Sequence, residues 1–365
     1  TGAHLQYELK KNGEHVKPRS AIKLPYRNNQ ERNVFNKLFL VVLVMTATLG
    51  FAQETEFKTI NNLIYHKSMF NASESIDLLK IPFGTGSSQV GGQDQDTDAL
   101  SYGIPWAFRM VEGGNIWVLD SLNRQLKLFK PDATVEKNIS LEGFGKIVID
   151  FAVAPDGRMA FLNSADGFIY ITDAKGDKIH SIEGFNGARA IEFDRNGELL
   201  VSHPVIQSVL RFSQNGELAE QMVGDQSLSL YSDPSGRLFG LEIADLDASL
   251  YLRTVASPAE TLAIGKFPYT EKHPGVTYAG GEILGLDAVG NVYFCLVACH
   301  EEGQIYRERL YRCAPDGKVL GELDIHTIPY LAPDLPRKRV VCPDGRVMGF
   351  YPTEEHFVLC TYTIP

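Results

Sequence analysis

A turn that ends in glycine and leads into an apolar strand recurs along most of this chain. The clearest copy is Gly114–Phe129, GNIWVLDSLNRQLKLF, in which a β-prone run, a polar turn and a second apolar run predict a β-hairpin. The same turn precedes an apolar run at five later glycines: Gly157, Gly197, Gly236, Gly290 and Gly345. Successive glycines are 43, 40, 39, 54 and 55 residues apart. These intervals are close to the roughly 40 to 50 residues of a four-stranded propeller blade.

Each repeat unit carries further strand signals around its glycine. An apolar segment precedes the turn, as at Ile149–Val153 and Ala190–Phe193, and a later polar turn such as AKGD at 174–177 often follows. A small twisted sheet cannot bury both of its faces alone, but sheets stacked around an axis bury one another. We therefore predict an all-β fold, a six-bladed β-propeller of four-stranded antiparallel blades. A β-sandwich with regular turns is the alternative, although sandwiches do not require self-similarity at this period.

We expect a strand from the N-terminal side to close the ring. The segment Ile76–Ile81, IDLLKI, reads as a strand upstream of the first unit, and the last unit reaches Pro365 with room for only three strands. The upstream segment can supply the missing outer strand. Residues 53–365 are therefore predicted to form a single propeller domain.

The run IWVLDSLNRQLKLF at 116–129 resembles the NHL-type propeller repeat, whose pattern is an apolar strand, Asp, a short link, Asn-Arg and a second apolar strand. The next two units keep the spacing but replace the Asp-x-x-Asn-Arg core, and the last three keep only the turn and the strands. The resemblance implies the propeller architecture. It implies no single activity, because such propellers include the senescence-marker and gluconolactonase proteins, the streptogramin lyases and pure binding modules.

The N-terminal part differs in composition from the repeats. Residues 1–33 are polar, contain seven Lys and Arg residues and precede the first methionine, Met45. We interpret them as an upstream extension that is disordered or not native. The next segment, Leu38–Ala52, has an apolar core of about 12 residues, shorter than the roughly 20 that span a bilayer, and ends in small residues. Residues 34–52 are therefore predicted to be a signal peptide, with an N-terminal membrane anchor as the alternative.

The charge balance bears on the partners. Cleavage after Ala52 would leave 27 of the 35 basic and 42 of the 45 acidic residues, a net charge of −15. We expect an exported protein, periplasmic or secreted, that is monomeric and has no stable membrane span after cleavage. The repeat region has no basic stretch with interleaved aromatic residues, so nucleic acid is not an expected partner. An unidentified protein or small-molecule ligand is expected instead.

The last two units are longer than the others. In the fifth, the extra residues fall within 295–313, CLVACHEEGQIYRERLYRC, which predicts an extended loop or hairpin arm. All five cysteines lie there or beyond, at Cys295, Cys299, Cys313, Cys342 and Cys360. In an exported protein Cys295 could pair with Cys313, or Cys342 with Cys360, and an odd number leaves at least one thiol unpaired. Buried free thiols and a zinc site at Cys295, Cys299 and His300 are the alternatives.

Polar residues recur at the end of the second strand in four consecutive units. In a propeller, the loops from the second to the third strand and the loops between blades lie around one end of the central channel, the usual ligand site. Six residues past each turn glycine, the chain has Asp120, Asn163, His203 and Glu242. The starts of the inner strands add Trp106, Asp150, Arg189, Glu282 and Arg337. We expect these nine residues to line a ligand-binding face.

Two functions suit such a face. The first, which we prefer, is a binding or scaffolding module. The second is a metal-dependent hydrolase or lyase of the lactonase kind, in which Asp120, Asn163 and Glu242 would hold a divalent cation such as Ca²⁺ or Mg²⁺, because hard cations prefer oxygen ligands. His203 would be the candidate general base, a role that needs a substrate and an orienting partner. The bland alternative is that these polar residues only end strands and cap solvated loops.

Overall fold

The computed structural model divides the chain into two units, Thr1–Ile60 and Asn61–Pro365. In the first unit, β1 (Leu9–Lys11) and β2 (Glu14–Val16) form an antiparallel hairpin. The predicted signal peptide at 34–52 lies outside the described residues. The structure describes residues 9–11, 14–16, 75–92, 104–223, 228–244, 247–253, 261–268, 276–300, 305–325, 339–353 and 355–365.

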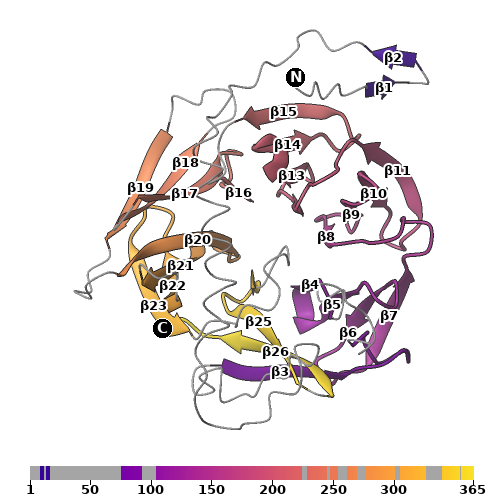
Figure 1. Ribbon diagram of the computed structural model, residues 1–365, viewed down its shortest axis with the longest axis horizontal. Helices are drawn as coiled ribbons and strands as arrows, with labels where there is room; N and C mark the ends of the chain where they lie inside the picture. The colour runs from indigo at the N-terminus through magenta and orange to yellow at the C-terminus, as the bar shows by residue number, and fades with distance from the viewer. Residues whose placement is uncertain are drawn as a thin grey trace, which may run out of the picture. The chain divides into compact units, whose positions relative to one another are not determined.

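The second unit is a ring of six four-stranded antiparallel sheets (Figure 1). Blades one to three consist of β4 (Ala107–Met110), β5 (Ile116–Asp120), β6 (Gln125–Phe129), β7 (Val135–Ser140); β8 (Asp150–Val153), β9 (Met159–Asn163), β10 (Phe168–Thr172), β11 (Lys178–Glu183); and β12 (Ala190–Phe193), β13 (Leu199–His203), β14 (Ser208–Phe212), β15 (Leu218–Val223). Blades four to six consist of β16 (Leu228–Ser232), β17 (Leu238–Ala244), β18 (Asp247–Arg253), β19 (Thr261–Pro268); β20 (Val276–Leu286), β21 (Val292–His300), β22 (Ile305–Cys313), β23 (Val319–Ile325); and β24 (Val340–Val341), β25 (Val347–Pro352), β26 (His356–Tyr362), β3 (Ser75–Pro82). The predicted architecture is therefore confirmed.

The ring closes as the sequence predicts. Strand β3 is the outermost strand of blade six and pairs antiparallel with β26, from Pro82 opposite His356 to Ser75 opposite Tyr362. The last blade thus combines one strand from the N-terminal side with three from the C-terminus. Because β3 and β4 are consecutive strands in different blades, the chain between them joins blade six directly to blade one.

The repeated glycines lie in tight turns, and three of these turns begin with an Asp side chain that accepts backbone N–H groups: Asp194, Asp233 and Asp287. In blade three, Asp194 Oδ1 accepts the backbone N–H groups of Asn196 and Glu198, each at 2.9 Å. Gly197 completes the turn with a φ of 73°, a left-handed conformation that glycine adopts without a Cβ penalty. This geometry explains why the turn glycine is the most regular feature of the sequence.

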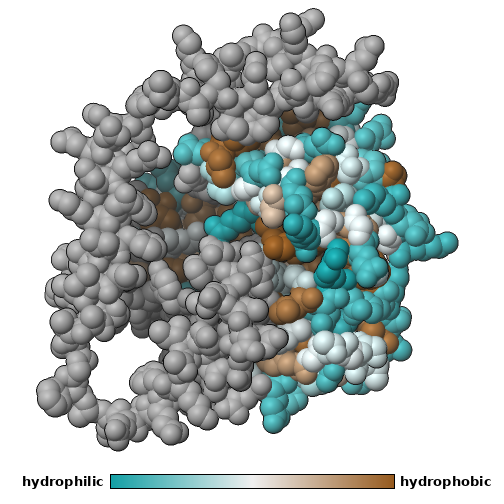
Figure 2. Space-filling model, turned by 45° about the vertical axis from the view of Figure 1, so that its right-hand side comes forward, coloured by the Kyte–Doolittle hydropathy of each residue, from teal (hydrophilic) through white to brown (hydrophobic). Residues whose placement is uncertain are grey.

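The outer strands face solvent. In β7 and β11, exposed and half-buried residues alternate, the pattern of an edge strand with one side against its blade. Hydrophilic side chains predominate on the described surface in Figure 2, with hydrophobic residues scattered among them. Among the described residues, no helix has the length and apolar character needed to cross a bilayer.

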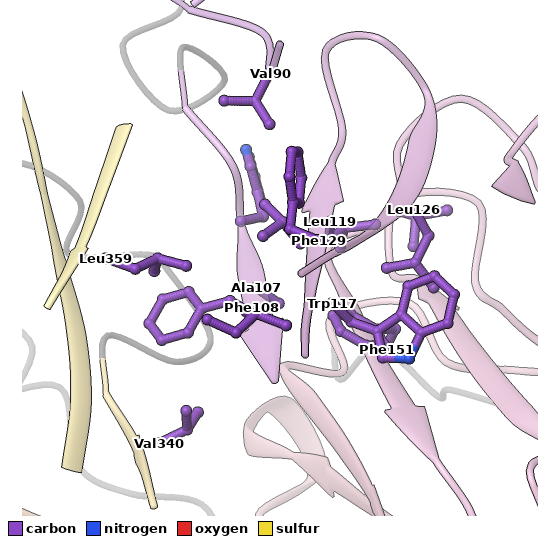
Figure 3. Packing of buried hydrophobic residues seen from close by; sticks show 14 of the residues in the cluster. Val90, Ala107, Phe108, Trp117, Leu119, Leu126, Phe129, Phe151, Val340 and Leu359 are labelled. Atoms are coloured by element: carbon purple, nitrogen blue, oxygen red, sulfur yellow. The ribbon is translucent and has the colours of Figure 1, made fainter. Parts of the chain in front are cut away.

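The hydrophobic core lies between neighbouring blades. The largest cluster joins blade six to blades one and two, and includes Phe108, Trp117, Phe151 and Leu359 (Figure 3). Between blades four and five, the Phe294 ring lies 4.8 Å from Phe267 and 5.0 Å from Tyr311, centroid to centroid. Blade-to-blade burial of this kind supplies the stabilisation that one sheet cannot provide alone.

Blade five carries the predicted hairpin arm. Its strands β20, β21 and β22 have 11, 9 and 9 residues. Strand β21 pairs with β22 from Val292 opposite Cys313 to Cys299 opposite Ile305. The five cysteines are all free thiols, so neither of the expected disulfides is present. Cys313 lies opposite Val292 rather than Cys295 in the sheet. Burial raises the pKa of the Cys313 and Cys342 thiols to about 12, which makes them unreactive structural side chains.

Candidate ligand-binding face

The second strands of the first three blades end at the residues that the sequence count selects. Strands β5, β9 and β13 end at Asp120, Asn163 and His203, and Glu242 lies two residues before the end of β17. The turns with the repeated glycines lie at the opposite ends of these strands. The four residues therefore lie at one end of the ring, near the loops that enter each blade.

Asp120 is buried and already has four hydrogen-bond donors. Its side chain is 1% exposed. Its Oδ1 accepts the backbone N–H of Gly91 at 2.9 Å and that of Asn123 at 3.2 Å, while its Oδ2 accepts Asn123 Nδ2 and Lys127 Nζ, each at 2.9 Å. A carboxylate has about four lone-pair sites, so this one is fully used. Its contacts fasten the turn after β5 and the loop that enters blade one.

Asn163 plays the same part in blade two. Its Nδ2 donates to the Phe144 carbonyl at 3.0 Å and to Asp166 Oδ2 at 2.9 Å, and its Oδ1 accepts the Asp166 N–H at 3.0 Å. Phe144 belongs to the loop between β7 and β8, and Asp166 to the turn after β9. In both blades, the residue at the strand end binds the residue three positions later and the entering loop.

The third motif residue of the NHL-like run acts on the other side of blade one. Arg124 Nη2 donates to the carbonyls of Gly145, at 2.9 Å, and Leu141, at 3.4 Å, in the loop that leaves for blade two. The Asp-x-x-Asn-Arg motif thus connects blade one to the loops on both sides. In this chain it has a structural role.

His203 is the exception in the series. The side chain is 1% exposed, and neither ring nitrogen has a hydrogen-bond partner among the described residues. Burial lowers the pKa of His203, so the imidazole is neutral at pH 7. The orienting partner that a general base needs is not present among the described residues.

Asp150 lies at the start of β8 and is bound by Arg109, which the sequence analysis missed. The fully buried carboxylate accepts Arg109 Nη2 at 3.3 Å and the Ile191 N–H at 2.9 Å. Arg109 Nη2 also donates to the Phe151 carbonyl at 3.0 Å and lies 3.7 Å from Glu192 Oε2. This ionic group joins β4, β8 and β12, the innermost strands of three successive blades. Its signal in the sequence is that Arg109 and Glu192 each lie five residues before a turn glycine.

The remaining predicted residues divide by exposure. Arg189, Glu242 and Glu282 are exposed, whereas Trp106 is buried. Arg337 lies outside the described residues. Two apolar side chains that the sequence analysis did not select are also exposed at this end of the ring: Leu122, 43% exposed in the turn after β5, and Val205, 66% exposed in the turn after β13.

A further buried ion pair joins blades five and six. Arg339, just before β24, donates to Glu308 on β22, and both side chains are nearly inaccessible to solvent. Burial lowers the pKa of the Arg339 guanidinium, but the attraction of Glu308 together with that of other nearby groups, Glu282 among them, outweighs burial and raises the pKa. The pair therefore fixes the start of the last blade against its neighbour.

Within the described residues, no three His, Cys, Asp or Glu side chains are grouped so that they could hold a metal ion. Asp120 and Asn163, two of the three predicted ligands, spend their oxygens on the protein itself. The exposed Glu242 is the third.

No protein-family model and no curated protein matches the chain. Among solved structures, it is similar to a member of the DUF4221 family from Bacteroides vulgatus, with 11% identity, coverage of 80% of this chain and 98% of that one, and a TM-score of 0.48. It is also similar to a streptogramin B lyase (11% identity, coverage of 79% and 97%, TM-score 0.45) and to the RRP9 WD40 repeats (11% identity, coverage of 80% and 98%, TM-score 0.46). Similarities at this level concern the fold alone and carry no argument about function.

Proposed function

We propose that this chain is an exported propeller that binds a protein or small-molecule ligand through the end of the ring where the second strands finish. The observation that supports this most is the use of the polar residues. Asp120 and Asn163, two of the three expected metal ligands, are buried and hydrogen-bonded within the fold, and so is Asp150 of the expected face. Asp120 and Asn163 fix loops in place and Asp150 joins inner strands of neighbouring blades. A rigid scaffold with fixed loops is suited to binding.

The exposed residues at the same end offer mixed contact chemistry. Val205 and Leu122 are apolar, Arg189 is cationic, and Glu242 and Glu282 are acidic. Apolar side chains beside charged ones are typical of a protein-binding surface with an apolar centre and a polar rim. The long β21–β22 pair of blade five extends this surface.

A matched pair of double variants tests this proposal. Arg189→Glu with Val205→Ser alters the proposed face, and Arg195→Glu with Val289→Ser alters exposed residues in turns at the other end of the ring. Each protein is cross-linked in its native extract, and the partners are identified by mass spectrometry. We expect the first double variant to lose a partner that the second retains. Equal retention by both, with unchanged thermal unfolding, would contradict the proposed face.

The alternative is a metal-dependent hydrolase or lyase, and one observation favours it. Glu242 on β17 and Glu282 on β20 are both exposed, and the strands pack closely beside them: a Cβ added to Gly281 would lie 2.8 Å from Leu241 Cδ2. Two carboxylates on packed strands of neighbouring blades could contribute to a Ca²⁺ or Mg²⁺ site.

Thermal unfolding decides between the two. The protein is treated with EDTA and then given excess Ca²⁺, Mg²⁺, Mn²⁺ or Zn²⁺, because an ion that binds only the native state raises the midpoint. A rise with one ion that disappears in Glu242→Gln, while Glu217→Gln retains it, would favour the enzyme and direct the search to lactone and ester substrates. The binding proposal predicts no ion-specific rise.

A further inference from the structure

The segment after β3 folds back and docks on blade one. It begins at Phe83, whose N–H donates to the Glu355 carbonyl at 2.8 Å, and it doubles back through two backbone bonds, Gly84 N to the Val90 carbonyl at 2.8 Å and Val90 N to the Pro82 carbonyl at 3.0 Å. Val90 is completely buried and belongs to the core cluster with Leu119 and Phe129 of blade one (Figure 3). We call residues 83–92 the clasp.

Lys127 of β6 binds the backbone of the clasp. Its side chain is completely buried, and its ammonium donates to Asp120 Oδ2 at 2.9 Å, to the Gln89 carbonyl at 2.5 Å and to the Gly86 carbonyl at 3.3 Å. An ammonium has three hydrogens to donate, and here all three are used. Two of the three acceptors belong to the clasp.

Two further bonds join the clasp to the same motif. The Gly91 N–H donates to Asp120 Oδ1 at 2.9 Å, and Asn123 Nδ2 donates to the Gly84 carbonyl at 2.8 Å. The clasp therefore makes four hydrogen bonds with three side chains of blade one, and two of those side chains form a buried ion pair.

The energetics of this ion pair make docking close to all-or-none. Removing an ammonium and a carboxylate from water costs several kcal/mol per ion unless their remaining hydrogen-bonding groups find partners. With the clasp docked, Lys127 has three acceptors; with the clasp released, it would keep only Asp120 from this set. Partial release is therefore unfavourable, and the clasp should leave blade one as a unit.

We propose that the clasp controls the opening of the ring between blades six and one, with the Lys127–Asp120 pair as its latch. The clasp follows β3 directly, and β3 is the outer strand of blade six. Release of the clasp removes its four hydrogen bonds to blade one, and β3 is then held by its pairing with β26 and by its buried side chains Leu79 and Ile81. The seam becomes the first part of the ring to open.

Hydrogen exchange of the full chain, followed by mass spectrometry, tests the proposal with two variants. Lys127→Met removes the charge of the latch. Gly91→Ala leaves the charges but adds a Cβ that would lie 2.4 Å from Leu122 Cβ and 3.0 Å from Asp120 Oδ1, so the clasp must move. We expect both to speed exchange at least tenfold in 75–92 and in β26, and to leave β12–β14 of blade three unchanged.

Asn163→Ala is the matched control, since it removes the equivalent bond to an entering loop in blade two. It should speed exchange in 141–149 and leave 75–92 unchanged. If Lys127→Met does not fold, Gly91→Ala decides alone. Faster exchange in all blades alike, or unchanged exchange in 75–92, would overturn the proposal.

Discussion

Blades one and three place different residues at the same point, and the structure uses them differently. Asp120 at the end of β5 accepts four hydrogen bonds, whereas His203 at the end of β13 makes none with either ring nitrogen among the described residues. Both side chains are 1% exposed. The position in the repeat therefore decides whether a side chain is buried. The residue type and the loop that contacts it decide whether the side chain forms hydrogen bonds to that loop.

Lys127→Met should have the largest effect on stability, because it disrupts the hydrogen-bonded site of Asp120 in blade one. It would leave the Asp120 carboxylate buried without its counter-charge, and removing one partner of a buried pair costs roughly 3–5 kcal/mol of the free energy of unfolding. Urea unfolding measures this loss. Lys80→Met is the control, because the Lys80 side chain is 60% exposed in its pair with Asp77 and such pairs contribute about 1 kcal/mol or less. Similar losses in the two variants would show that the buried pair does not stabilise blade one.

Arg109→Met should have the next largest effect. It removes the Arg109 cation from Asp150, which is completely buried, but Arg109 itself is 13% exposed and so is partly solvated. We expect a loss of about 2–3 kcal/mol in urea unfolding, below the range for a fully buried pair. A double-mutant cycle with Asp150→Asn isolates the interaction. Additive losses in that cycle would contradict the inferred coupling between the first strands of blades one and two.

Much of the fold could be predicted because its strongest signal is local. A turn glycine and the apolar run after it occupy a few consecutive residues, so their period revealed six blades, and the remaining strand signal at Ile76–Ile81 indicated how the ring closes. The same counting placed Asp120, Asn163 and His203 at strand ends, as the structure has them.

The use of those residues could not be read from the repeat. The donor to Asp120 from Gly91 is 29 residues away, and Arg109 and Asp150 are 41 residues apart. A count from the turn glycine gives the position along a strand, but it does not say which groups a loop from the neighbouring blade will bring to it. The hydrogen bonds that give these candidate ligands a structural role are therefore visible only in the three-dimensional structure.

A fall in pH should weaken the His203 site. Because burial lowers the pKa of His203 in the folded state, the unfolded chain binds the proton first. The contribution of His203 is fully present above the unfolded value of about 6.5 and is lost as pH falls from there through the lower folded pKa, with a slope no steeper than about 1.4 kcal/mol per pH unit.

Urea unfolding between pH 7.5 and 5 measures this slope, and His203→Leu should make it shallower. His180 also contributes to the slope, because burial and the charge of Arg158 lower its pKa as well. A second variant, His180→Leu, measures that contribution. An unchanged slope in His203→Leu would mean that His203 is not held neutral in the folded protein.

The smallest expected effect is a gain, and it would convert blade three into a copy of blade two. The entering loops of the two blades share the sequence Glu-Gly-Phe, at 142–144 and 183–185, and in blade two Asn163 donates to the Phe144 carbonyl. His203→Asn should place an amide within reach of the equivalent Phe185 carbonyl. It also removes two ring nitrogens that have no hydrogen-bond partner in the part of the chain that the structure describes. We expect the free energy of unfolding at pH 7.5 to rise by about 0.5–1.5 kcal/mol, the usual net value of one hydrogen bond. His203→Leu separates the two causes, because it removes the nitrogens without adding a donor. If the Asn and Leu variants gain equally in free energy of unfolding, the gain comes from removing the imidazole. The hydrogen bond from the strand end to the entering loop is then specific to blades one and two.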